Sequence, residues 1–225
     1  MSLLVKICGL KTPETVAAAL EAGADMVGFV FFPRSPRNVS LTEAALLAEP
    51  VRGRAGIVAL TVDATDDDLA AIVDVLRPDL LQLHGAETPK RAAAVRARFG
   101  VPVMKAVRIA EAADLAPVAA FAPHVDRFLF DAKPPPALAG ALPGGNGLAF
   151  DWRLVRDLDP GRPYMLSGGL DPANVARAIA VTRTPAVDVS SGVESAPGVK
   201  DPDRIRAFLR EARAGAAGAA GEAAA

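Results

Sequence analysis

Residues that form disulfides or bind transition metals are scarce in this sequence, which has one cysteine and two histidines among 225 residues. A single cysteine cannot form an internal disulfide, and no cysteine pair or histidine cluster has the spacing of metal ligands. We therefore expect a protein of the reducing cytoplasm that binds no metal.

The chain also lacks an excess of charge of either sign and any long apolar run. Its 25 Lys and Arg residues and 26 Asp and Glu residues give a net charge of −1, so no broad positive field attracts nucleic acid or an anionic membrane. No apolar stretch reaches the ~18 residues of a spanning helix, and the first residues lack the features of a secretory signal. We expect no nucleic-acid partner and no membrane association, and an anionic ligand must be held by local groups.

Short apolar runs alternate with alanine-rich amphipathic stretches along the chain, which is typical of buried parallel strands that are each followed by a helix. The predicted strands are Leu3–Ile7, Met26–Phe31, Gly56–Val62, Leu80–Leu83, Val103–Val107, Arg127–Phe130, Pro163–Leu166 and Ala186–Val189. The predicted helices are Pro13–Ala22, Leu41–Ala48, Asp66–Leu76, Thr88–Phe99, Ala110–Phe121, Trp152–Leu158, Pro172–Ala180 and Pro202–Arg213. Eight such units indicate one α/β domain, a (β/α)8 TIM barrel. An open doubly wound sheet is disfavoured, because no Rossmann glycine fingerprint follows the first strand.

The barrel is predicted to span residues 1–213. Residues 214–225 read AGAAGAAGEAAA, and their side chains are too small to anchor the segment to a core, so we expect a frayed, disordered tail. Thr12, Asp171 and Asp201 each precede a proline and are predicted to cap the helices that follow.

Two predicted connections, residues 32–40 and 131–149, are longer than the usual two to six residues. Both follow the carboxyl end of a strand, where barrel enzymes build their sites. Cys8 ends the first strand at this face. It is either a small buried hydrophobe, as free cysteines usually are, or a candidate catalytic base. Asp131, which ends the sixth strand, is either a turn carboxylate or an acid group of the site.

Glycine and serine residues follow the seventh and eighth strands, at Gly168, Gly169, Ser190, Ser191 and Gly192. Glycine lets backbone N–H groups approach an anion closely, and helix N-termini add a favourable dipole. Phosphate between these two loops is a recurrent barrel arrangement, so we predict a barrel of the phosphate-binding type. Because the strand order around the mouth is six, seven, eight, one, Asp131 and Cys8 would flank the phosphate from opposite sides.

Three more polar residues belong to the expected rim. Arg37 is either a solvated surface residue or a partner for a planar carboxylate, with Arg34 as the alternative in the same loop. His84, which follows the fourth strand, is either a satisfied rim residue or a substrate contact. Asp188 is predicted to support the loop after the eighth strand, and Lys6 receives no role.

The segments VKICGL, FVFFPRSPR, LQLHG, FLFD with the later PGGNGLAFDW, SGGL and VDVSSGVE occur in this order. With them the chain resembles the phosphoribosylanthranilate isomerase family over residues 3–213. The resemblance implies a cytoplasmic enzyme of tryptophan biosynthesis, a monomer or homodimer. Its reaction would be the cofactor-free Amadori rearrangement of N-(5-phosphoribosyl)anthranilate to 1-(2-carboxyphenylamino)-1-deoxyribulose 5-phosphate. It also implies that Asp131 is the general acid, Cys8 is the general base, and Arg37 faces the anthranilate carboxylate. Asn146 departs from the threonine that the family often has there.

Two other interpretations stay open at this point. The chain could be another sugar-phosphate isomerase on the same barrel, including one that also acts on the histidine-pathway substrate, or a phosphate-binding barrel without catalysis. Such isomerases typically have Asp where Cys8 stands, so the cysteine favours the tryptophan-pathway substrate. A non-catalytic barrel has no need of Cys8, Asp131 and Arg37 together.

Overall fold

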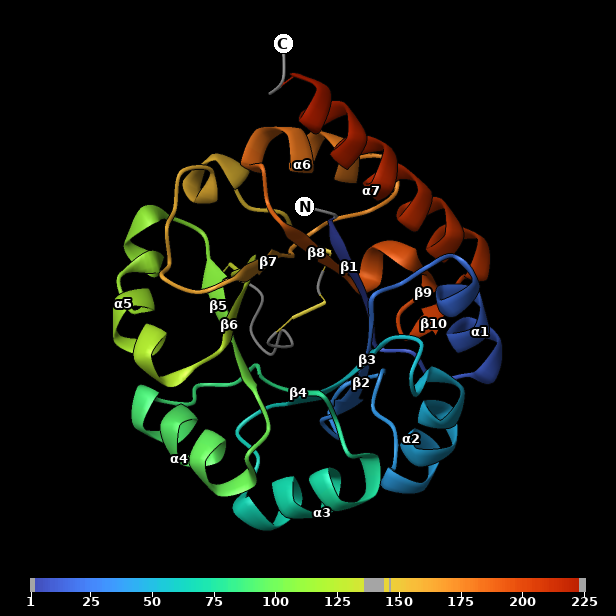
Figure 1. Ribbon diagram of the computed structural model, residues 1–225, viewed down its shortest axis with the longest axis vertical. Helices are drawn as coiled ribbons and strands as arrows, with labels where there is room; N and C mark the ends of the chain where they lie inside the picture. The colour runs from blue at the N-terminus through green and yellow to red at the C-terminus, as the bar shows by residue number, and fades with distance from the viewer. Residues whose placement is uncertain (1–2, 136–143, 146, 223–225) are drawn as a thin grey trace.

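The computed structural model describes residues 3–135, 144–145 and 147–222, which form a closed barrel of eight parallel strands surrounded by helices (Figure 1). Each strand pairs with the next along the chain, and β8 pairs with β1 to close the sheet. The barrel strands are β1 Leu4–Cys8, β2 Met26–Phe31, β3 Gly56–Thr61, β4 Leu80–Leu83, β5 Val103–Ile109, β6 Arg127–Ala132, β7 Tyr164–Leu166 and β8 Ala186–Val189. The predicted TIM barrel is therefore confirmed.

Helices connect the strands on the outside of the barrel. The α-helices are α1 Pro13–Glu21, α2 Leu41–Ala48, α3 Asp66–Leu76, α4 Pro89–Phe99, α5 Val118–Phe121, α6 Val175–Thr182 and α7 Pro202–Glu222. Short 3-10 helices are η1 Glu49–Val51, η2 Ala112–Leu115, η3 Ala122–His124, η4 Trp152–Val155 and η5 Ser191–Val193. A small antiparallel hairpin, β9 Glu194–Ala196 with β10 Val199–Lys200, lies between β8 and α7. No helix in the described residues combines the length and the apolar character that a membrane crossing requires.

Three predicted helices are shorter than expected or divided, in each case near a proline. The fifth is divided into η2 and α5, because Pro117 between them has no N–H to continue a helical ladder. The sixth is only the short η4, which ends at Val155, and Pro160 disfavours helical conformation at Asp159 beyond it. α6 begins at Val175, because Asp171 instead caps the preceding turn, where its Oδ1 accepts from the Ala173 and Asn174 amides at 2.8 and 3.0 Å.

The other two predicted caps are present. Thr12 Oγ1 accepts from the Thr15 amide at 3.3 Å, and Asp201 Oδ1 accepts from the Asp203 amide at 2.9 Å. Both prolines that follow stand at the first helical position, where the missing N–H breaks no hydrogen bond.

The last helix extends further than the sequence predicts, and it differs from the expected frayed tail. α7 continues to Glu222 and runs along the outside of the barrel beside α6 and α1 (Figure 1). Gly215 lies so close to α6 that a Cβ atom there would be 2.7 Å from Cα of Ala176. The sequence predicted disorder in this segment because its side chains are small. The same small size allows α7 to lie close to α6.

Alternation along the strands places apolar side chains deep in the barrel and polar ones at its mouth. Leu129 of β6 belongs to an apolar cluster that fills the barrel interior, and two residues later Asp131 lines a pocket. On β8, Ala186 and Asp188 repeat this relation. Because successive side chains of a strand point to opposite faces, residues two apart share the interior face. The mouth is therefore built on a packed apolar floor.

The contact between α7 and α6 predicts opposite effects for two similar substitutions. A Cβ on Gly218 would meet no atom within 4 Å, so Gly218→Ala gains about 1 kcal/mol of helix propensity and raises the melting temperature by about 2–4 °C. Gly215→Ala has the same propensity gain but forces α7 away from Ala176, so we expect a lower melting temperature. Circular dichroism melting of both variants checks this, and equal shifts would contradict the α6–α7 contact.

Candidate active site

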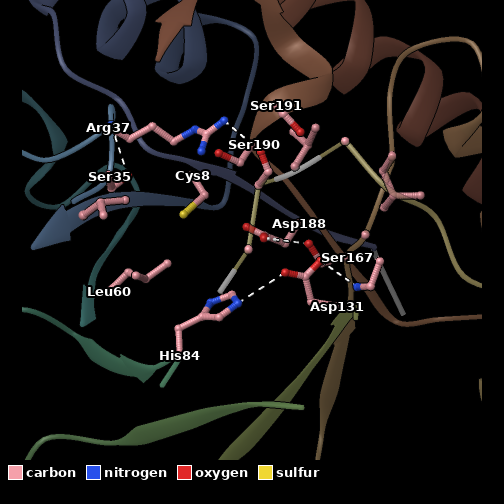
Figure 2. A pocket seen from close by; sticks show the side chains of 18 of the residues that line it. Cys8, Ser35, Arg37, Leu60, His84, Asp131, Ser167, Asp188, Ser190 and Ser191 are labelled. Carbon is pink, nitrogen blue, oxygen red and sulfur yellow. Dashed lines mark hydrogen bonds and ion pairs between the residues drawn. The ribbon is translucent and has the colours of Figure 1, made fainter. Parts of the chain in front are cut away.

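A pocket that is partly open to solvent lies at the carboxyl ends of the barrel strands (Figure 2). Four predicted site residues reach it from strands or strand ends, namely Cys8, His84, Asp131 and Asp188. Five more reach it from loops, namely Arg37, Gly168, Gly169, Ser190 and Ser191. Gly192 is just behind the wall, beside Leu170. The structure therefore brings together the residues that the sequence selected.

Asp131 and His84 form a buried pair in this pocket. His84 Nε2 is 3.2 Å from Asp131 Oδ2, and the Gln82 amide nitrogen is 2.9 Å from His84 Nδ1. With that amide nitrogen facing Nδ1, this ring nitrogen accepts and Nε2–H donates to Asp131. Asp131 Oδ1 also accepts from the Ala132 amide at 2.9 Å. Gly144 lies against the pair, because a Cβ on this residue would be 2.6 Å from Asp131 Oδ2.

Cys8 is 3% exposed and faces the pocket at the end of β1. A Cβ on Gly28 would be 2.9 Å from Cys8 Sγ and 3.3 Å from Lys6 Cε, so glycine on β2 makes room for both side chains. Burial raises the pKa of the Cys8 thiol, although the ammonium groups of Lys6 and Lys200 act in the opposite direction. The thiol is therefore the resting form at neutral pH, and two buried cations are available to stabilise a thiolate.

Lys6 and Asp188 form an ion pair across the seam between β1 and β8, with Nζ 2.7 Å from Oδ1. Burial alone would lower the pKa of Lys6, but the Asp188 carboxylate and Cys8 raise it above its ordinary value. Asp188 Oδ2 also accepts from Ser167 Oγ at 3.1 Å. Asp188 thus supports the end of β7 and Lys6, whereas the sequence predicted support for the loop after β8.

Glycines allow the loops after β6, β7 and β8 to lie against one another. Gly168 and Gly169 have φ values of +84° and +65°, which L side chains rarely adopt. A Cβ on Gly168 would be 2.6 Å from the Ala132 nitrogen, and one on Gly192 would clash with the Leu170 carbonyl oxygen. The helix that follows the β7 loop begins only at Val175. For binding an anion at this wall, close approach of the backbone is therefore more important than the predicted helix dipole.

Arg37 is buried and paired, and is not the solvated residue of the alternative interpretation. It is 5% exposed, with Nε 2.7 Å from Glu194 Oε1 and Nη2 2.8 Å from Glu194 Oε2. Its Nη2 also donates to the Gly145 carbonyl at 3.0 Å. Arg34, the other arginine of this loop, is exposed and does not line the pocket. Figure 2 shows Arg37 and His84 on different sides of Cys8.

Sequence reasoning missed three residues that hold the site in place. Gln82 orients His84, and it could have been found because Leu80, Gln82 and His84 share one strand face. Glu194 and Lys200, 2.6 Å apart, belong to the short hairpin after β8, which has no periodic signal. Asn146 lies outside the described residues. Within those residues no three His, Cys, Asp or Glu side chains gather as a metal ion would require.

Comparison with known proteins gives consistent findings. The sequence model of N-(5'phosphoribosyl)anthranilate (PRA) isomerase matches residues 5–211. An N-(5'-phosphoribosyl)anthranilate isomerase from Rhodopseudomonas palustris (strain BisB5) is 58% identical over 214 residues, 95% of this chain and 97% of that protein. One from R. palustris (strain BisA53) is 60% identical, with 95% of this chain and 97% of that protein covered.

Solved structures are similar over nearly the whole chain. Phosphoribosyl anthranilate isomerase from Thermotoga maritima gives a TM-score of 0.82 at 34% identity, covering 94% of this chain and 99% of that one. A phosphoribosyl anthranilate isomerase in complex with reduced 1-(o-carboxyphenylamino)-1-deoxyribulose 5-phosphate gives 0.80 at 33% identity, with the same coverage.

The environment of Cys8 predicts how its reactivity depends on pH. Because burial raises the pKa of this thiol, we expect alkylation by iodoacetamide to be slow at pH 7, and its rate to rise with an inflection at a higher pH than for an ordinary cysteine. Mass spectrometry reports on this site alone, because the chain has one cysteine. The protein unfolded in denaturant is the reference with an ordinary thiol, and Cys8→Ser corrects for other modified groups. An inflection below that of the unfolded protein would contradict the assignment.

Proposed function

We propose, since this chain belongs to the N-(5'-phosphoribosyl)anthranilate isomerase family, that Cys8 and Asp131 transfer the protons of its reaction. The enzyme catalyses the Amadori rearrangement of N-(5-phosphoribosyl)anthranilate to 1-(2-carboxyphenylamino)-1-deoxyribulose 5-phosphate, a step of tryptophan biosynthesis. Its substrate is a small phosphosugar. One observation carries the assignment of the two residues: the thiol and the carboxyl group line the same pocket from different strands.

In the first step, Asp131 acts as general acid. Its carboxyl proton moves to the furanose ring oxygen while the bond between C1′ and that oxygen breaks. The lone pair of the anthranilate nitrogen forms the C=N bond of the resulting iminium ion. His84 holds the carboxyl group in position, because its Nε2 is 3.2 Å from Oδ2.

In the second step, the Cys8 thiolate acts as general base and removes the proton from C2′. The electrons of the C2′–H bond form the C1′=C2′ bond, and those of the C=N bond return to nitrogen. The enol then becomes a ketone, as C1′ gains a proton and the C2′ hydroxyl loses one. Hydrogen is redistributed within one molecule, so the reaction needs no external oxidant, reductant or cofactor.

Catalysis needs a Cys8 thiolate, whereas burial raises the pKa of Cys8 and favours the thiol in the ligand-free site. The Lys6 and Lys200 ammonium groups act in the opposite direction and stabilise the thiolate. Asp131 supplies its proton as a carboxylic acid, and His84 and the Ala132 amide hold its two oxygens in position.

Substrate recognition divides between the two ends of the pocket. Backbone N–H groups of Gly168, Gly169 and Ser191, with the Ser190 hydroxyl, suit the phosphate, since glycine permits close backbone approach to an anion. Arg37 suits the anthranilate carboxylate, because its guanidinium is always charged and its N–H groups form charge-assisted hydrogen bonds with a carboxylate. Gly192 supports the loop from behind, and Asp188 supports Ser167.

We also propose that the protein works in the cytoplasm as a monomer or homodimer, without nucleic acid. One solved structure, 34% identical to this chain, contains mutually generated monomers of the dimeric phosphoribosylanthranilate isomerase from T. maritima. The near-zero net charge supports the absence of a nucleic-acid partner.

Removing either proton-transfer group is expected to reduce turnover severely. A positioned acid or base contributes about 10²–10⁴-fold, so Cys8→Ala and Asp131→Asn should each lower kcat by that factor. The assay follows the loss of fluorescence of freshly generated phosphoribosylanthranilate. No turnover by the wild-type protein would overturn the function, and full activity of Cys8→Ala would overturn the assignment of the base.

The matched control is Arg34→Ala, which removes an exposed arginine from the loop that carries Arg37. We expect its kcat and KM to stay close to those of the wild-type protein. We expect Arg37→Ala to raise KM, because it removes the proposed partner of the substrate carboxylate. An equal effect of Arg34→Ala would show that the loop as a whole, and not the guanidinium of Arg37, determines activity.

A further inference from the structure

We propose that Glu194 is a positioning residue for Arg37, and that it thereby sets the enzyme's selectivity for substrates that carry a carboxylate on the aromatic ring. The inference rests on the proposed function, because it deepens the role proposed for Arg37. Glu194 does not line the pocket, so it acts through the guanidinium and not by touching the substrate.

The pair is a side-on, bidentate contact. Arg37 Nε and Nη2 lie 2.7 and 2.8 Å from the two carboxylate oxygens of Glu194, and both residues are buried, with exposures of 5% and 6%. Two parallel hydrogen bonds fix the plane of a guanidinium as well as its position. The Gly145 carbonyl accepts a third hydrogen bond from Nη2. The two N–H groups of Nη1 take no part in these three bonds and can therefore serve a ligand.

The stem of Arg37 is confined as well. Gly9 has a φ of +79°, and a Cβ there would be 2.9 Å from Arg37 Cδ, so the stem lies directly against the backbone after β1. The Arg37 amide donates to Ser35 Oγ at 3.1 Å. With the stem and the guanidinium plane both fixed, Nη1 is held in one direction at the pocket wall.

Glu194 is itself held by several donors. Lys200 Nζ is 2.6 Å from Glu194 Oε1, and the Gly198 amide donates to Oε2 at 3.1 Å. Lys200 Nζ also donates to the Ser190 carbonyl at 2.9 Å and to its hydroxyl at 3.2 Å. The β9–β10 hairpin pairs Glu194 with Lys200 directly. The carboxylate therefore lies between Arg37 and Lys200, and these donors hold it in one orientation toward the guanidinium.

A role in recognition explains this arrangement better than a role in stability. The attraction within a buried ion pair does little more than offset the free energy of removing the two charges from water. Such a pair is therefore weak evidence that it stabilises the fold. The group of Arg37, Glu194 and Lys200 carries a net charge of +1 beside the pocket. Glu194 offsets one of the two cations, so the remaining positive charge is exposed only through the face of Arg37 that lines the pocket.

Binding of two ligands tests the proposal by calorimetry at pH 7. One is reduced 1-(o-carboxyphenylamino)-1-deoxyribulose 5-phosphate, and the other is the same compound without the ring carboxyl group. A charge-assisted hydrogen bond from Nη1 corresponds to about 10–100-fold in affinity, so the wild-type protein should prefer the carboxylated ligand by that ratio. Glu194→Gln should lower the ratio about tenfold while affinity for the other ligand changes little. A merely structural role would weaken both ligands equally and would overturn the proposal.

Glu87→Gln is the matched control, because Glu87 is 8% exposed and its Oε2 lies 2.7 Å from Lys105 at another part of the barrel rim. It removes the same charge from a similar buried pair, so the ligand ratio should stay at the wild-type value. A fall as large as that of Glu194→Gln would overturn the proposal, because loss of any buried rim carboxylate would then suffice.

Two further variants keep the outcome decisive. Arg37→Ala should abolish the preference, and the double variant with Glu194→Gln should lose no more, as expected when one residue acts through the other. If Glu194→Gln does not fold, Glu194→Asp keeps the charge but shortens the side chain, and an unchanged ratio in Glu194→Asp would overturn the proposal. A wild-type protein without any preference would refute the proposed role of Arg37 itself, whereas a preference that survives in Glu194→Gln refutes only the inference about Glu194.

Discussion

The seam between β1 and β8 is the constraint on which the rest of the structure depends. Lys6 and Asp188 are register partners there, separated by 182 residues in the chain and joined by one buried ion pair. Closing the sheet at this register puts the thiol of Cys8 beside the loops after β7 and β8. An open sheet with the same strands would leave Cys8 at one edge and Asp188 at the other, and no single pocket could include both.

Charge buried at the mouth of the barrel follows from the same geometry. The interior face is apolar near the floor and ionic near the rim, where buried cations have a carboxylate at 2.7 Å, as in Lys6–Asp188, Arg37–Glu194 and Lys105–Glu87. Breaking such a pair leaves an uncompensated charge, which costs far more than the intact pair contributes. The rim is therefore rigid against partial rearrangement, and the polar groups keep their directions before a ligand arrives.

Much of the fold can be predicted from the sequence, because parallel strands buried on both faces leave apolar runs of the right length. The site residues at strand ends, such as Cys8 and Asp131, follow from counting those runs. The helices near Pro117 and Pro160 could not be placed as well, since the proline effects depend on where the preceding turn ends. Register across the closed seam leaves no trace in local sequence, so the partner of Lys6 could not be predicted. The hairpin that carries Glu194 is too short to give a periodic pattern.

The glycine contacts among the loops after β6, β7 and β8 have a consequence for protein engineering. Gly168 packs on Ala132, Gly169 on Ala149 and Gly192 on Leu170, so each loop is shaped to the bare backbone of the next. Such loops cannot be exchanged singly between barrels, because a graft at one position introduces side chains where its neighbour has left no space. Engineering a new specificity into this barrel therefore requires all three loops to be replaced together.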